Sequence, residues 1–500
     1  MDAKRNLFCR HLWPIFFLLG ALIYAGCMAG IIPATGEKRY LGFSWEEEVK
    51  LGKQASQEVA TTFGIYKDAK LERYVDGIGQ RVLARSHLRR PETGPEFRNT
   101  PVTFQILDSP IINAMALPGG HIYVTRGMLA HLNNEDQLAV VLAHEIGHVT
   151  ARHAARQTWQ QQIGQGLLLG GAILGQSLGL PAQQLLNLGG AAAQLIFLRY
   201  SREDELEADR LGVEYSSLAG YNAREVTDFF RSLARIQEKE GQGLPNFLST
   251  HPDPGNRIER IKELTAKWRS EQAERPARPE DYYAAIEGMV MGEDPRQGFV
   301  ERNIFYHPDL GFQFPVPQGF KVVNQPTQVI MVENKNRAIL GFTLTAEKSL
   351  DAAASKFLQQ GGLKVIESNR VRSGSLPAIA AIADGQMANG QVVRLLAYFV
   401  NYRGRIYNFV GYTSPDAFAS FRSVFLQTMS GFGEVRDSRV LKREPVRLQL
   451  QRADRNAPFK AFVPPQLPQD MRPEDLAILN QVTLTQEIPR GTILKLPKSS

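Results

Sequence analysis

Cysteine is almost absent from this chain of 500 residues. The sequence contains two cysteines, Cys9 and Cys27. Removal of an export signal that ends near Cys27 leaves at most one of them, so no disulfide can form within the processed chain. An exported protein without disulfides depends for its stability on a buried core and on any metal that it binds.

The sequence also lacks a long apolar run. The first candidate, residues 12–25, has 14 residues, and the second, residues 166–180, has 15 and is interrupted by Gln176. A transmembrane helix needs about 20 apolar residues. A basic segment, 1–10, precedes the first run, and this order is typical of a secretory signal. We therefore predict export, and we interpret 163–198 as a helical hairpin, with plain core helices and a true span as the alternatives.

The end of the first apolar run resembles the lipobox of bacterial lipoproteins, because Ala25 and Gly26 precede Cys27. Tyr24 stands where that motif usually has an aliphatic residue. The resemblance implies that residues 1–27 are a lipoprotein signal and that Cys27 tethers the chain to the outer membrane, in the periplasm. An ordinary signal peptide and an uncleaved anchor are the alternatives.

Excess charge of one sign is also small. Lysine and arginine number 58 against 51 acidic residues, a net charge of +7, which is too weak to predict a nucleic-acid partner. Part of the excess lies within residues 434–460, and we interpret 436–462 as a solvated basic linker. Attraction to anionic membrane surfaces is the alternative interpretation of this segment.

Hydrophobic periodicity predicts an α+β protein. Residues 40–285 form a mainly helical domain with a small sheet, because a capping box at Ser44 and Glu47 and an N-cap at Asn134 begin helices. Residues 300–435 alternate as strands and form an α+β domain with an antiparallel sheet. Helices are expected at 44–63, 68–86, 134–157, 202–219, 223–239 and 254–270, and strands of the small sheet at 102–107, 111–117 and 121–125.

The tail, residues 463–500, resembles the second half of a LysM-type peptidoglycan-binding module, with a helix at 473–480 and a strand near 488–496. The first half of such a module is not evident. Contact with peptidoglycan and a small structural cap are therefore the two interpretations of the tail.

The most specific motif is His144-Glu145-Ile146-Gly147-His148. Positions four apart on a helix lie one turn above each other, so His144 and His148 can bind one ion, with Glu145 beside them. Zinc held by three protein ligands keeps a fourth position for water, and a neighbouring carboxylate can take the proton of that water. The motif predicts a zinc-dependent endopeptidase in which Glu145 is the general base.

The third ligand is not in the neighbourhood of the motif. Ala151 and Ala154 stand where a metzincin has glycine and histidine. His153 lies about 140° around the helix from His148, so we interpret it as a surface group or a group behind the ligands.

An acidic segment, 201–209, supplies better candidates, because Glu205 and Asp209 are four apart and face the same way. One carboxylate can bind the metal while the other holds a ligand imidazole. A solvated charged face is the alternative.

The motif at 144–148, the pair Glu205 and Asp209, and the segment 113–120 together resemble a family of HExxH metallopeptidases. This family includes the CAAX prenyl proteases and the HtpX heat-shock protease, and soluble periplasmic BepA-type members are the most similar. The resemblance covers roughly residues 45–264. It implies one Zn²⁺ on His144, His148 and Glu205, and Asp209 as the residue that orients a histidine.

The resemblance implies two further features. Asn113, Ala114, Met115 and Ala116 belong to an edge strand beside the cleft, where an extended substrate adds as a strand. His251, in Ser-Thr-His-Pro at 249–252, is either a ligand that closes the site or a catalytic donor to the oxyanion. A loop histidine that caps the following helix is the alternative.

The C-terminal half departs from the BepA pattern, because no tetratricopeptide repeat follows residue 285. The expected substrates are misfolded or misassembled proteins of the bacterial envelope, including unfolded outer-membrane proteins. A chaperone or assembly factor with a latent site is the competing hypothesis, and a cell-wall-binding protein is a third.

Overall fold

The computed structural model describes residues 29–158, 199–240, 247, 250–252, 256–268, 279–359, 363–386, 391–468 and 471–498. The chain divides into two compact units. Unit 1 contains the described parts of 1–60, 64–291 and 447–498, and unit 2 consists chiefly of 292–446. The hairpin expected at 163–198 lies outside the described residues.

Unit 1 is mainly helical, as the sequence predicts. The side chain of Ser44 accepts from the backbone N–H of Glu47 and begins the first long helix, and Asn134 caps the helix that carries the HExxH motif. These two helix starts are therefore confirmed. The helices of unit 1 are α2 (Trp45–Phe63), α3 (Ala69–Leu83), α4 (Pro95–Arg98), α5 (Arg126–His131), α6 (Glu135–Thr150), α10 (Arg202–Leu218), α11 (Val226–Glu240), α13 (Arg257–Trp268), α14 (Pro279–Ile286) and α18 (Pro473–Leu479).

Helix α6 ends earlier than the expected residue 157. It stops at Thr150 because Arg152 adopts a left-handed backbone conformation with a φ of 57°. The guanidinium of Arg152 donates to the carbonyls of Ile31 and Phe43 and to the carboxylate of Glu48. These contacts with residues more than 100 positions away fix the turn, and helix resumes at residue 153.

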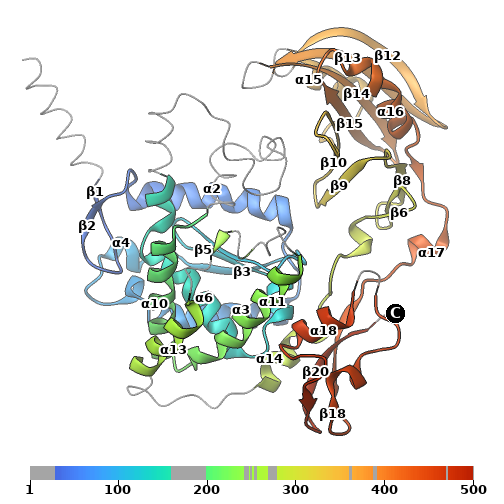
Figure 1. The fold of residues 1–500 in the computed structure, drawn as a ribbon. Coiled ribbons are helices and arrows are strands. Elements are labelled where there is room, and N and C mark those ends of the chain that lie inside the picture. The colour runs from blue at the N-terminus through green and yellow to red at the C-terminus, as the bar shows by residue number, and fades with distance from the viewer. Residues whose placement is uncertain are drawn as a thin grey trace, which may run out of the picture. The chain divides into compact units, whose positions relative to one another are not determined.

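The small sheet has the order β3-β5-β4, with bounds of Thr103–Leu107 for β3, Ala114–Leu117 for β4 and His121–Thr125 for β5. Central β5 runs parallel to β3 and antiparallel to β4. Helices α3 and α6 cover one face of this sheet and α2 lies on the other (Figure 1). Strand β4 is thus an edge strand of the sheet, immediately beside α6.

The C-terminal residues return to unit 1. Strand β17 (Arg447–Arg452) pairs antiparallel with β20 (Ile493–Lys498), and β18 (Ala457–Pro458) pairs with β19 (Glu487–Ile488). The buried Lys495 ammonium donates to the carbonyls of Ala130 and Leu132, at 2.6 and 2.9 Å. Gln481 and Gln137 exchange side-chain hydrogen bonds at the start of α6. The tail has the expected helix and strand, while its LysM character stays a prediction.

Unit 2 contains a seven-stranded antiparallel sheet in the order β12-β13-β14-β15-β11-β10-β9 and a four-stranded sheet in the order β16-β8-β7-β6. Its α+β character with a large antiparallel sheet is confirmed. The elements are β6 (Phe299–Glu301), β7 (Ile304–His307), β8 (Phe312–Pro315), β9 (Phe320–Gln325), β10 (Gln328–Glu333), β11 (Ala338–Leu344), α15 (Leu350–Gln359), β12 (Lys364–Ser373), β13 (Leu376–Gln386), β14 (Val392–Tyr402), β15 (Arg405–Thr413), α16 (Phe418–Ser430), β16 (Gly433–Glu434) and α17 (Ser438–Leu441).

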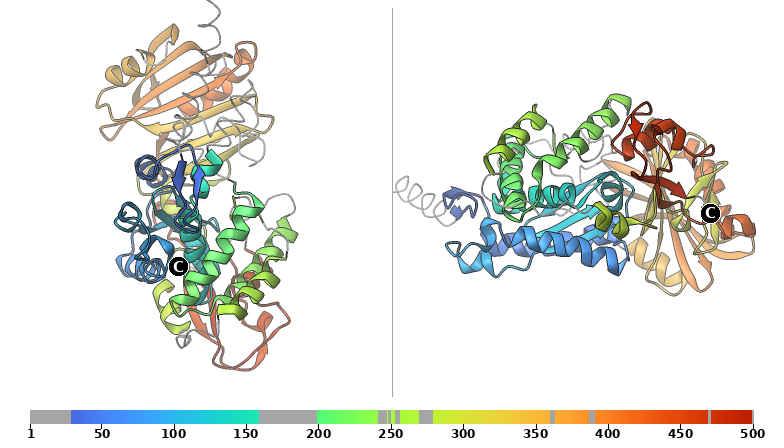
Figure 2. Two further views of the ribbon diagram at one scale, coloured as in Figure 1. Left: turned by 90° about the vertical axis from the view of Figure 1, so that its left-hand side faces the viewer. Right: turned by 90° about the horizontal axis from the view of Figure 1, so that it is seen from below.

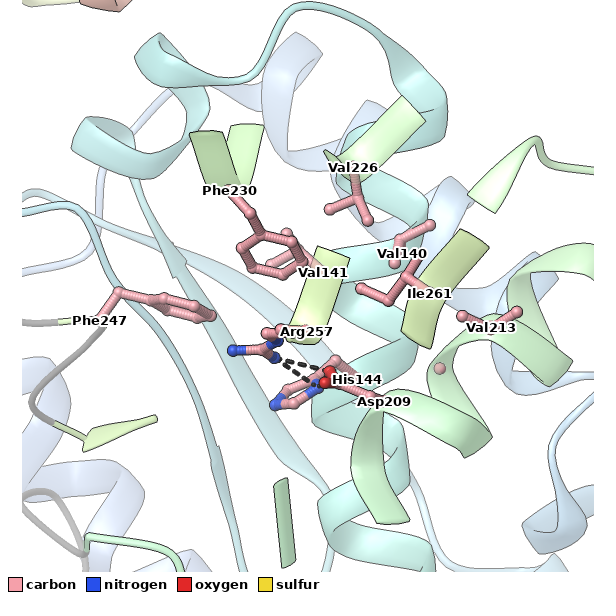
Figure 3. Close-up of a pocket in the computed structure, with 11 residues that line it drawn as sticks. Val140, Val141, His144, Asp209, Val213, Val226, Phe230, Phe247, Arg257 and Ile261 are labelled. Atoms are coloured by element: carbon pink, nitrogen blue, oxygen red, sulfur yellow. Dashed lines mark hydrogen bonds and ion pairs between the residues drawn. The ribbon is translucent and has the colours of Figure 1, made fainter. Parts of the chain in front are cut away.

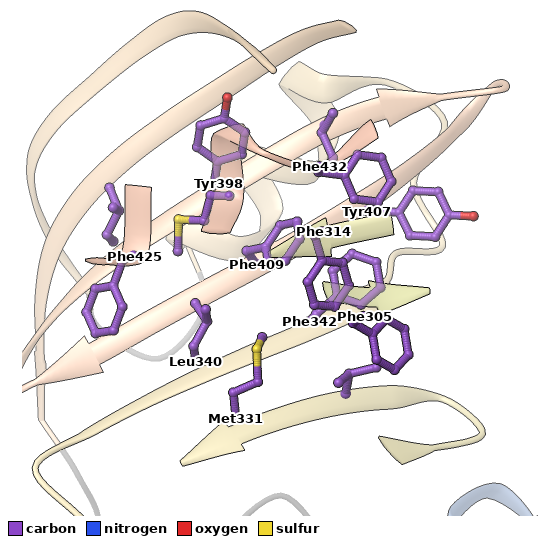
Figure 4. Packing of buried hydrophobic residues seen from close by; sticks show 14 of the residues in the cluster. Phe305, Phe314, Met331, Leu340, Phe342, Tyr398, Tyr407, Phe409, Phe425 and Phe432 are labelled. Carbon is purple, nitrogen blue, oxygen red and sulfur yellow. The ribbon is translucent and has the colours of Figure 1, made fainter. Parts of the chain in front are cut away.

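Aromatic side chains fill the core of unit 2 (Figure 4). Phe342 lies at its centre, with ring centroids 4.5 Å from Phe409 and 4.9 Å from Phe314. Burial of such rings is a main source of stability. Residues 436–462, expected as a linker, contain α17, β17 and β18 in this structure.

None of the helices that the structure describes combines the length and the apolar character that crossing a membrane requires. The sequence candidates for such a segment lie outside the described residues.

Candidate metal centre

Two helices bring the predicted site residues together. Helix α10 packs along α6, as Figures 1 and 2 show. The approach is close because Gly147 and Gly212 face the partner helix: a Cβ added to either would lie 3.1 Å from a backbone atom of the other helix. A capping box between Ser201 and Asp204 begins α10, and its first turns carry Glu205 and Asp209.

His144, His148, Glu205 and His251 form a buried cluster. Each offers one ligand atom, and these atoms all lie within 4.8 Å of one another. The Nε2 atoms of His144 and His148 are 3.0 Å apart, and the Glu205 carboxylate oxygens lie 3.5 and 3.4 Å from them. The Nδ1 of His251 is 3.0 Å from Glu205 Oε1. The structure therefore places the expected ligands and His251 at one point.

Asp209 lies behind this cluster. Its Oδ1 is 3.0 Å from Nδ1 of His144, and Nη2 of Arg257 donates to the same oxygen at 2.6 Å (Figure 3). A carboxylate in this place fixes the ring orientation of a ligand histidine. Although burial opposes ionisation of Asp209, Arg257 and His144 together keep its pKa below the ordinary value.

Glu145 is fully buried, and its carboxylate receives no hydrogen bond from the described residues. Nε2 of His251 lies 3.6 Å from Glu145 Oε1. Burial raises the pKa of the Glu145 carboxyl. A carboxylate that is costly to keep ionised and lies beside the cluster is suited to accept a proton.

The residues fit a divalent cation. Oε2 of Glu205 is buried and has no hydrogen-bond partner among the described residues, an arrangement that is costly unless another group compensates for it. Burial opposes ionisation of Glu205, but His251, His144 and His148 hold its pKa well below the ordinary value. Two imidazoles and an ionised carboxylate are a donor set that zinc prefers.

Strand β4 borders the cluster. A cavity beside His148 is lined by Ala116 and Leu117 of this strand and by Val149 and Tyr200. The expected strand residues Ala114, Met115 and Ala116 lie in β4, and Asn113 immediately precedes it. The segment that leads to His251 approaches the same strand, because the Phe247 N–H donates to the carbonyl of Ile112 at 3.1 Å.

Two contributors to the site were not predicted from the sequence. Arg257 follows the Ser-Thr-His-Pro segment and reaches Asp209 from 48 residues away. Tyr200 stacks on the His148 ring with centroids 3.8 Å apart. Neither belongs to a periodic or motif-like pattern, apart from the nearness of Tyr200 to the acidic segment and of Arg257 to His251.

An HExxH helix whose histidines face a glutamate of a second helix defines the class of HExxH metallopeptidases. Residues 69–265 match the model of Peptidase family M48. The family resemblance inferred from the motifs is thus confirmed.

Several curated proteins are similar to this chain over about half of its length. The chain is 29% identical over 234 residues to the beta-barrel assembly-enhancing protease of Yersinia pestis, covering 46% of each chain. It is 30% identical over 272 residues to a putative beta-barrel assembly-enhancing protease of Vibrio cholerae, covering 51% of this chain and 53% of that protein. The mitochondrial metalloendopeptidase OMA1 of Schizosaccharomyces pombe is 29% identical over 258 residues, covering 49% and 71%. The chain spans about half the length of the bacterial relatives.

Proposed function

We propose that this chain is a zinc-dependent endopeptidase of the bacterial cell envelope that hydrolyses peptide bonds of misfolded or misassembled proteins. The observation that carries the proposal is the buried cluster of His144, His148 and Glu205 with Glu145 beside it. Its relatives named beta-barrel assembly-enhancing protease support substrates connected with outer-membrane protein assembly.

In this proposal His144, His148 and Glu205 hold one Zn²⁺. Bound there, the ion supplies the Lewis acidity that activates water and polarises a carbonyl. Asp209 holds the His144 ring in position through the 3.0 Å contact with Nδ1. Arg257 shares Asp209 and neutralises part of the negative charge behind the cluster.

Glu145 moves the proton. As general base its carboxylate accepts a proton from the attacking water, and as general acid it returns that proton to the amine nitrogen that leaves. The raised pKa of Glu145 favours its protonated form, in which it holds the proton taken from water, because burial makes the carboxylate less stable than in water. His251, with Nε2 3.6 Å from Glu145, is placed to donate to the developing oxyanion when its segment leaves Glu205.

Strand β4 positions the substrate. One of its edges pairs with β5 in register from Ala114 to Leu117. An extended peptide that adds to the other edge brings its backbone across the cluster, with main-chain hydrogen bonds that do not depend on side-chain sequence. Such binding suits a peptidase that acts on unfolded chains. Export, periplasmic location, a lipid tether at Cys27 and peptidoglycan contact through the tail belong to this proposal as well.

The test compares Glu145→Gln with the wild-type chain on casein or an unfolded outer-membrane protein. We expect cleavage to fall by about 10²–10⁴-fold, because the amide cannot accept the proton. Glu203→Gln is the matched control, since Glu203 is exposed in the first turn of α10. Undiminished cleavage by the Glu145→Gln variant would contradict the proposal.

A second candidate function is an assembly factor or chaperone whose zinc site is normally latent. It is favoured by the position of His251, whose Nδ1 is 3.0 Å from Glu205 within the ligand cluster. A histidine there occupies the place that a substrate carbonyl needs. Complementation of a deletion strain by Glu145→Gln would support this candidate, whereas failure to complement would support the peptidase.

A further inference from the structure

His153 lies directly behind the second metal-binding histidine. Its side chain is fully buried, and its Nδ1 is 2.9 Å from Nδ1 of His148. On the opposite side of the ring, Nε2 lies 3.2 Å from Glu207 Oε2 and 3.7 Å from Asp204 Oδ1. The left-handed residue Arg152 ends α6 and turns the chain, so that His153 does not continue the helical spacing.

The hydrogen-bonding capacity of the two rings fixes their protonation. The Nε2 atom of His148 faces His144 and Glu205, so a metal ligand at this nitrogen leaves the single ring proton on Nδ1. That N–H then donates to His153, which must accept at Nδ1 and carry its own proton on Nε2. The Nε2–H of His153 is aimed at the carboxylate of Glu207. His148, His153 and Glu207 therefore form one chain of hydrogen bonds, in which each ring donates toward Glu207. The chain leaves Nε2 of His148 without a proton and able to bind the metal.

The two ligand histidines differ in what holds them. A carboxylate, Asp209, accepts from His144, whereas a neutral imidazole accepts from His148. Tyr200 stacks on the His148 ring but provides no hydrogen bond to Nδ1. Within the described residues, His153 is the group that contacts this nitrogen. Without it the N–H of a buried ring has no acceptor among the described residues, and among them only the stacked Tyr200 ring remains to orient it.

We propose that His153 is a positioning residue that fixes the tautomer and the ring orientation of His148 and so raises the affinity of the site for zinc. This inference rests on the proposed metal site at His144, His148 and Glu205. It assigns to His153 a hydrogen bond toward the ligand, and it assigns to Glu207 the orientation of His153.

The experiment compares two substitutions of equal shape. Asn in place of His153 keeps an acceptor oxygen at the position of Nδ1, and Leu places a methyl group there. We expect His153→Leu to bind Zn²⁺ about 10–100-fold more weakly in competition with a chelator. His153→Asn should recover most of the affinity. The visible absorption spectrum of the Co²⁺-substituted chain should change in the His153→Leu variant. In the His153→Asn variant it should stay close to the spectrum of the wild type.

A purely structural role has a different signature. In that case both variants lower the thermal stability of the metal-free chain, and the affinity for Zn²⁺ and the Co²⁺ spectrum are the same for Asn and Leu. Equal affinities of the two variants, whether weakened or not, overturn the inference. A wild-type chain that binds neither Zn²⁺ nor Co²⁺ overturns the proposed function itself, and with it this role of His153.

Discussion

His307, at the end of β7 in unit 2, shows how burial changes the chemistry of a single side chain. Its Nδ1 accepts from the backbone N–H of Leu310, and burial lowers the pKa of His307 to about 4. In an unfolded chain the pKa of histidine is about 6.5. Between these values the unfolded state binds a proton that the folded state does not, so stability falls as the pH falls through this window.

We therefore expect the stability of unit 2 to fall by about 2 kcal/mol between pH 7.5 and pH 5 through this residue alone. His307→Asn keeps the acceptor for Leu310 and removes the titrating group. Hydrogen exchange of the β7 and β8 amides, measured for both chains at both pH values, checks the prediction. An equal loss of protection in the variant would contradict it.

At the residue scale, local spacing predicted more of the site than any other signal. The Nε2 atoms of His144 and His148 lie 3.0 Å apart because a helix places positions four apart on one side, and the sequence alone contains that spacing. The contact between Arg257 and Asp209 spans 48 residues and depends on how α13 packs against α10. No property of Arg257 in the sequence distinguishes it from the other basic residues, so its place could not be predicted.

At the element scale, the tail elements are held to unit 1 by the buried amine of Lys495, whose pKa is lowered well below its ordinary value by burial. Lys495 donates to the carbonyls of Ala130 and Leu132 at the C-terminal end of α5, where a helix leaves carbonyls without partners. Loss of the ammonium leaves these two buried acceptors unsatisfied.

Lys495→Met should therefore lower the free energy of unfolding of unit 1 by about 1–3 kcal/mol. It should also increase cleavage of the tail by an added protease. Lys498→Met is the matched control, because Lys498 lies exposed on the same strand. If both variants resist unfolding and proteolysis as well as the wild type, Lys495 does not fix the tail.

The starts of α2 and α6 were predicted closely, whereas the end of α6 was not. Ser44 and Asn134 begin helices through contacts within three residues, which a sequence reveals directly. The end of α6 at Thr150 results from contacts of Arg152 with Ile31, Phe43 and Glu48, which only the folded chain brings together. The expected helix through residue 157 is therefore interrupted at residues 151–152, and helix resumes at residue 153.

At the scale of the whole molecule, the proposed metal site belongs to unit 1 alone. Removal of metal with a chelator should lower the stability of unit 1 by about 4 kcal/mol relative to metal at a thousand times its Kd. Hydrogen exchange in α6 and α10 should rise, while β13 and β14 of unit 2 keep their protection. Equal effects on the two units, or none on unit 1, would contradict a metal site at His144, His148 and Glu205.

The return of the tail makes unit 2 an insertion within unit 1. The chain leaves unit 1 and returns to it at neighbouring residues. The Gly288 N–H donates to the carbonyl of Leu448, and the Leu448 N–H donates to the carbonyl of Met289. Val290 also pairs with Arg447. Sequence patterns could not predict this pairing, since its partners are separated by the whole of unit 2.

Lys495 reaches α5 only after the ribosome has added more than 200 residues beyond α13. During synthesis, unit 2 is therefore available to fold before unit 1 is complete, reversing the usual order in which the N-terminal domain folds first. The helix that carries His144 and His148 gains its contact between Gln137 and Gln481 only after unit 2 has been made. Assembly order thus delays the completion of unit 1 until residues 447–498 have been made.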